Sequence, residues 1–139
     1  MAFFQRAYNT RQYESACIGD STKRLEAGCA VVLKKLAFGI AAPDFYHQVA
    51  VCDGKEAPFG VVSASPGTAI SSASPGQVVL MNSGLIPVLL NAASVKGDLV
   101  RPKTMEGKWE KIAAGETPYA RLLEDGAAGD LAWAIPVNR

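Results

Sequence analysis

The stretch SASPGTAISSASPG, residues 63–76, holds the same pentapeptide twice, nine residues apart. Ser-Pro-Gly suits a type II turn, because proline fits the second position and glycine accepts the positive φ of the third. Two such turns predict two changes of chain direction around Thr68–Ser71. A flexible linker is the weaker interpretation, since the apolar segment Gln77–Met81 follows at once. The stretch therefore favours a fold of short strands joined by tight turns.

Glycine and proline divide the chain after residue 28 in the same way. The gaps between them are mostly shorter than an average helix of about 11 residues, but they suit strands of about 5 or 6. Short strands at this spacing are typical of an all-β sandwich or barrel. The predicted strands are Ala30–Leu33, Tyr46–Cys52, Phe59–Val62, Gln77–Met81, Ile86–Leu90, Asp98–Arg101, Lys108–Ile112, Tyr119–Leu123 and Leu131–Val137.

Several of these segments alternate between two kinds of side chain. In LAWAIPV, residues 131–137, the large apolar side chains take every second position, so that one face is large and the other small. Trp109 has the opposite parity from its charged neighbours. We expect Trp109 and Trp133 to face the core. Leu85–Leu90 is expected to be a core strand, with an oligomer interface as the alternative.

The predicted fold class is mainly β: a small antiparallel β-barrel or β-sandwich over residues 28–139, preceded by an N-terminal arm over residues 1–27. The arm lacks clean strand alternation and is expected to be extended or a short helix, with a second helical candidate at residues 21–27. Arginine and aromatic residues are enriched in interface cores. Either the arm packs on its own domain or it contacts a neighbouring chain through Phe3, Phe4, Arg6, Tyr8, Arg11 and Tyr13.

Composition limits the function further. A chain of 139 residues suits one domain, and with 49% hydrophobic and 19% charged residues it should bury a core. The formal net charge of +1 gives no reason to expect a nucleic-acid partner. We find no signal peptide and no run near the roughly 20 apolar residues of a membrane helix. The sequence therefore predicts a soluble protein made in a cytoplasm, with no membrane partner.

Catalytic patterns are weak. His47 is the single histidine, and no GxSxG or phosphate-loop pattern occurs. A thiol hydrolase would have to use Cys52 and His47, and a zinc site would need Cys17 and Cys29 as well, at spacings that structural zinc sites do not favour. Three reduced, mostly buried thiols are the simpler interpretation. We therefore expect no catalytic residues, no metal and no cofactor, and we predict a structural or binding protein rather than an enzyme.

Four pieces of the chain form one pattern: Ala57–Val62, Gly76–Leu80, Val95–Val100 and Ala120–Leu131. A Gly-Val strand leads to a Gly-x-Val-x-Val strand, a Gly-Asp turn follows, and a second Gly-Asp precedes the last apolar strand. This pattern resembles that of the head-decoration, or capsid cement, proteins of tailed bacteriophages. The resemblance covers about residues 57–139, and the N-terminal portion does not align with it.

This resemblance implies a small β module that binds the outer surface of an assembled phage head and stabilises contacts between major capsid protein subunits. It implies the exterior of the virion as the location, the major capsid protein as partner, and self-association as a homotrimer. The residues of the arm named above would then contact the shell or an adjacent protomer. The alternative is a receptor- or glycan-binding β-module of a virion, such as a fibre or spike domain, which would need exposed aromatic residues around a groove.

Overall fold

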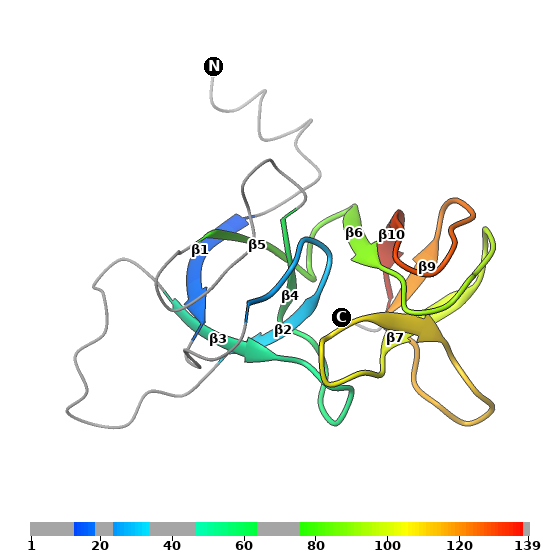
Figure 1. Cartoon of the computed structure of the whole chain (residues 1–139), viewed down its shortest axis with the longest axis horizontal. Coiled ribbons are helices and arrows are strands. Elements are labelled where there is room, and N and C mark those ends of the chain that lie inside the picture. The colour runs from blue at the N-terminus through cyan, green and yellow to red at the C-terminus, as the bar shows by residue number, and fades with distance from the viewer. Residues whose placement is uncertain (1–12, 19–23, 34–46, 64–75, 138–139) are drawn as a thin grey trace, which may run out of the picture.

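A computed structural model describes residues 13–18, 24–33, 47–63 and 76–137, which form ten β-strands and no helix within these ranges (Figure 1). Five strands close into a barrel, and the other five form a second sheet beside it. The barrel consists of β1 (Tyr13–Ile18), β2 (Ala30–Leu33), β3 (His47–Val51), β4 (Gly60–Val62) and β5 (Gly76–Leu80). The second sheet consists of β6 (Ile86–Leu89), β7 (Leu99–Pro102), β8 (Trp109–Lys111), β9 (Ala120–Leu122) and β10 (Leu131–Pro136).

The barrel closes in the order β1-β3-β2-β4-β5, and β5 pairs with β1. All of its pairs are antiparallel except β1 with β3, which run parallel. Its interior is filled largely by valines, because short β-branched side chains pack well on a pleated surface. Val31, Val49, Val62 and Val78 are fully buried there, whereas Val61 and Val79 face the core shared with the second sheet.

The second sheet has the order β6-β10-β9-β7-β8 and is antiparallel throughout. Its two outer strands meet, because Leu90, just after β6, forms a bridge to Trp109 in β8. The N–H of Asn91 donates to the carbonyl oxygen of Trp109 at 2.8 Å. The sheet therefore curls until its edges touch, which leaves little unpaired strand edge.

Two Gly-Asp-Leu turns, at residues 97–99 and 129–131, interlock in the second sheet. The N–H of Gly97 donates to the carbonyl of Leu122 at 2.9 Å, and that of Gly129 donates to the carbonyl of Leu90 at 2.8 Å. Both glycines have positive φ, +91° and +87°, which other residues rarely adopt. The leucine N–H groups donate to the carbonyls of Asp98 and Asp130 in the same crossed manner. Each turn is thus held by the strand that leads into the other.

Trp109 joins the two sheets. Its side chain is fully buried, and its indole Nε1–H donates to the carbonyl oxygen of Gly28 at 3.1 Å. The same oxygen accepts from the N–H of Leu89 at 3.1 Å, while the N–H of Ala30 donates to Gly107 at 2.9 Å. One buried cluster includes Trp109 together with residues of β2, β4 and β5 from the barrel and of all five strands of the second sheet. The barrel and the sheet therefore share a core.

The predicted fold class is confirmed, since the described chain is mainly β and combines a barrel with a second sheet. All nine predicted strands are present, with bounds shifted by one residue at most. Leu85–Leu90 provides core residues, because Ile86, Val88 and Leu90 are fully buried. The N–H of Ser63, just after β4, donates to the carbonyl of Gln77 in β5 at 2.9 Å, so the two ends of the repeat segment lie side by side. The two turns predicted for this segment lie outside the described residues.

The N-terminal region differs from the expectation in two ways. Residues 13–18 belong to the segment predicted as an arm, yet they form β1 and pair with β3 and β5. The helix predicted for residues 21–27 is wrong over the described part of that segment, because residues 24–27 are not helical and Leu25 is buried. The physical reason is tertiary: β1 closes the barrel, and pairing on both sides outweighs the weak local pattern.

Trp109→Phe should destabilise the protein by roughly 2 kcal/mol, because the smaller ring leaves a void and loses the bond to Gly28. Urea unfolding followed by far-ultraviolet circular dichroism measures this change. Trp133→Phe, at a half-buried site on the outer side of β10, is the matched control and should cost less than about 1 kcal/mol. Equal losses in the two variants would contradict the role of Trp109 at the junction.

Candidate interaction surfaces

The structure does not support a thiol hydrolase site built on Cys52 and His47. Cys52 is 1% exposed, and its Sγ–H donates to the carbonyl oxygen of Glu56 at 3.3 Å. Burial raises the pKa of the Cys52 thiol above its ordinary value, so that the neutral thiol predominates at neutral pH. A nucleophilic cysteine needs the opposite shift. His47 is placed at the start of β3, and its side chain lies outside the described residues.

The other thiols also behave as structural residues where they are described. Cys29 is buried and reduced, and burial raises its pKa from 9.0 to about 11. Within the described ranges, no group of three or more histidine, cysteine or acidic side chains is arranged to hold a metal ion. The side chain of Cys17 lies outside those ranges. Also within them, no helix is long and apolar enough to span a membrane.

Most charged side chains form local ion pairs. Lys103 Nζ lies 2.6 Å from Glu116 Oε1, and this hydrogen bond lowers the pKa of the Glu116 carboxyl. Lys108 pairs with Glu106 at 3.0 Å. Such exposed pairs contribute little to stability. Arg121 is exposed and takes part in no ion pair among the described residues, which makes it available to a partner.

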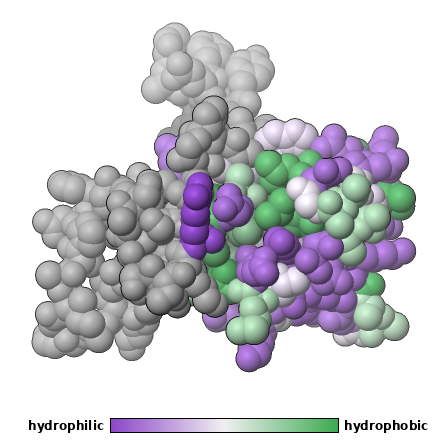
Figure 2. All heavy atoms as spheres, in the orientation of Figure 1, coloured by the Kyte–Doolittle hydropathy of each residue, from purple (hydrophilic) through white to green (hydrophobic). Residues whose placement is uncertain are grey.

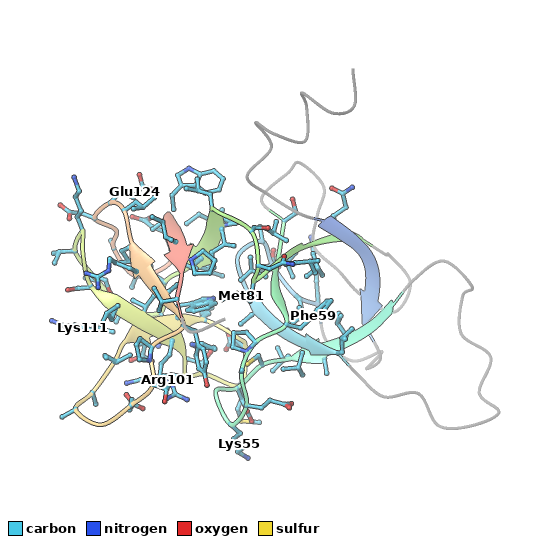
Figure 3. The ribbon with its side chains drawn as sticks, turned by 180° about the vertical axis from the view of Figure 1, so that it is seen from behind. Lys55, Phe59, Met81, Arg101, Lys111 and Glu124 are labelled. Carbon is cyan, nitrogen blue, oxygen red and sulfur yellow. The ribbon has the colours of Figure 1, made fainter. Side chains whose placement is uncertain are left out.

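The first candidate surface is a hollow of about 400 Å³ where the barrel meets the second sheet, called here the junction groove. Phe59 and Met81, labelled in Figure 3, come from the barrel side, and Tyr119 comes from the sheet. Arg101 lies over the Tyr119 ring at 5.6 Å and donates to the carbonyl of Gly54 at 2.5 Å, which fixes that wall. The groove is mostly apolar and is lined by Ala57, Pro58, Phe59, Leu80, Met81, Asn82, Tyr119 and Val137.

A second hollow, of about 370 Å³, lies over Cys29. Its rim carries both signs of charge, and these already pair locally, Arg24 with Glu26 and Lys108 with Glu106. The exposed Met105 lies at its border. The hollow therefore offers no uncompensated charge to a ligand.

The second candidate surface is the outer side of β10, called here the β10 outer face: Leu123, Leu131, Trp133 and Ile135. Leu131 is 44% exposed and Ile135 is 39% exposed, whereas Leu123 and Trp133 are half-buried. On the space-filling view, hydrophobic residues break the hydrophilic surface on the side of the second sheet (Figure 2). The expectation that Trp133 faces the core is wrong. Ala132 and Ala134 point inward instead, into the cluster that Trp109 fills.

The predicted contact residues of the arm are not brought together by the described structure. Phe3, Phe4, Arg6, Tyr8 and Arg11 lie outside the described residues. Tyr13 begins β1, where its backbone pairs with Val79 of β5. Sequence reasoning missed the β10 outer face, although the alternation of LAWAIPV marked it; the pattern shows two unlike faces but not which one is covered.

Comparison with known proteins adds one finding. No family model and no curated protein matches the sequence. A solved structure described as the head fiber gp8.5 N base in bacteriophage phi29 is similar, with a TM-score of 0.66 over 91% of this chain and 94% of that chain. The two proteins share a fold. Their sequences are only 12% identical, so the similarity concerns the architecture and not individual surface residues.

Alkaline pH should destabilise the protein in part through Cys29. Its pKa is higher in the folded state, about 11 against 9.0, so its contribution is present below pH 9 and is lost as the pH rises toward 11. We expect the free energy of unfolding of the native protein to fall by roughly 2 kcal/mol more than that of Cys29→Ser between these pH values. Urea titrations at pH 7, 9 and 11 test this, and parallel curves for the two proteins would contradict it.

Proposed function

We propose that this chain is a structural protein of a tailed-phage virion that binds the outside of the assembled head. There it would contact the major capsid protein and stabilise the contacts between its subunits. The observation that supports the proposal is the shared fold with a head-fiber base over nearly the whole length of both chains. The resemblance of residues 57–139 to head-decoration proteins points to the same place on a virion.

The physical character of the described residues suits this role. Both sheets close or nearly close, and a shared core holds them as one body. The two described thiols are protonated and buried, so chemistry at these sites is not expected, and we propose that the protein is not an enzyme. A head-binding protein needs rigid surfaces instead. Each bound copy stabilises only the assembled state, and many copies act together.

A second candidate function has its own support. The structurally similar protein is the base of a head fiber, which favours an attachment module whose main task is to hold an adhesive structure. The junction groove, with Phe59 and Tyr119 in its walls, would be the site for a receptor or glycan in that case. Both candidates require binding to the head. They differ in whether the head itself becomes more stable.

Co-sedimentation with expanded, undecorated phage heads tests the proposal. We expect saturable binding at a copy number that matches a symmetry position of the head, and no binding to free capsid subunits. Heating then separates the two roles: decorated heads should release DNA at a higher temperature than bare heads if this protein is a cement. Binding without a thermal shift would favour the fiber base, and the absence of binding would reject both roles.

The arm gives a separate prediction. Deletion of residues 2–12 should lower the occupancy on heads if the aromatic and arginine side chains of this segment contact the shell. The deletion keeps Tyr13, so that β1 and the closure of the barrel are retained. An unchanged urea midpoint is the control for folding. Unchanged occupancy in a folded variant would show that the arm is not the tether.

A further inference from the structure

The larger apolar side chains of β10 point away from the core, and its small side chains point into it. In an antiparallel sheet with one side in water, apolar side chains usually point inward and polar ones outward. Here the inward positions of β10 are Ala132 and Ala134, and the outward ones are Leu131, Trp133 and Ile135. The larger apolar side chains are therefore on the side that the rest of the described chain leaves partly open. Apolar groups gathered in this way mark interaction sites.

The sheet register makes these side chains one continuous patch. The N–H of Leu123 donates to the carbonyl of Trp133 at 2.9 Å, so that these residues are neighbours across β9 and β10. Ile135 pairs with Arg121, which in turn pairs with Leu99 of β7. The patch lies on the interior strands of the sheet and not on an edge. Its partner must therefore bind through side chains rather than by adding a strand.

Charges of opposite sign stand at the two ends of this patch. Arg121 is exposed beside Ile135. Glu124 is exposed near the other end, where its Oε1 accepts from the N–H of Trp133 at 3.1 Å. A surface with an acidic end, an apolar centre and a basic end is complementary to a copy of itself.

We propose that the β10 outer face binds the same face of a second copy of this chain, with Trp133 and Ile135 covered and Arg121 of each copy facing Glu124 of the other. This inference rests on the proposed function, because it names the surface through which copies associate on a head. Tryptophan and arginine are the residues that most often dominate binding energy at interfaces. Because the same face of each copy takes part, the contact is isologous and gives a two-fold symmetric dimer.

The mass of the free 139-residue protein, measured by sedimentation equilibrium over a wide range of concentrations, tests the inference. We expect a dimer for the native chain and at least ten-fold weaker association for Ile135→Lys. Met105→Lys is the matched control, because Met105 is 75% exposed and borders the hollow over Cys29 rather than belonging to the β10 outer face, and it should associate like the native chain. Circular dichroism and urea midpoints verify that each variant is folded.

A charge exchange tests the surface independently of Ile135. Arg121→Glu should weaken association, and adding Glu124→Arg to it should restore at least part of the loss, because the two ends then attract again. If Ile135→Lys fails to fold, the single and double charge variants test the inference without it. No rescue by the double variant, or a native chain that stays monomeric at every concentration, would overturn the inference.

A measurement of head binding by the native chain and by Ile135→Lys shows whether this inference or the proposed function fails. A chain that binds heads but is monomeric in solution, and that loses head binding in Ile135→Lys, would place the shell on this face instead of a second copy. A chain that self-associates as expected but never binds heads would leave the self-association surface standing and reject the proposed function. The two failures therefore give different results.

Discussion

The carbonyl oxygen of Gly28 accepts two hydrogen bonds, from the backbone N–H of Leu89 and from the indole of Trp109, each at 3.1 Å. Gly28 sits between the two sheets with a φ of +83°, and a Cβ atom there would come within 2.6 Å of the Leu89 nitrogen. Only glycine lets the chain pass so close. The rest of the structure depends on this junction, since it lets Trp109 fill the space between the barrel and the second sheet.

The junction also accounts for the unusual arrangement of β10. Because Trp109 occupies the shared core, β10 contributes only small side chains, Ala132 and Ala134, to that cluster. The larger side chains of the same strand then lie outside, where Leu131 and Ile135 remain more than a third exposed. Core packing and surface character are thus coupled through one tryptophan. A module that attaches to a large assembly would use such a surface directly, without a ligand pocket.

The sequence by itself determined the class of the fold and nearly all of its strands. Dense glycine and proline set the limits of nine strands, and apolar segments between them were long enough for strands only. The burial of Leu85–Leu90 and of Trp109 followed from local pattern as well. The two Gly-Asp-Leu turns at residues 97–99 and 129–131 could also have been anticipated, but not the hydrogen bonds that cross-link them. These features are local, so a short window of sequence contains the information.

Only the tertiary structure decided the rest. Residues 13–18 carry no clear strand pattern and become β1 because β3 and β5 offer partners on both sides. Alternation along LAWAIPV predicted two unlike faces, but the position of Trp109, over 20 residues earlier in the chain, decided which face is buried. The junction groove combines residues near 58, 81 and 119 for the same reason. Contacts between distant segments depend on how the sheets pack, and no local pattern encodes that.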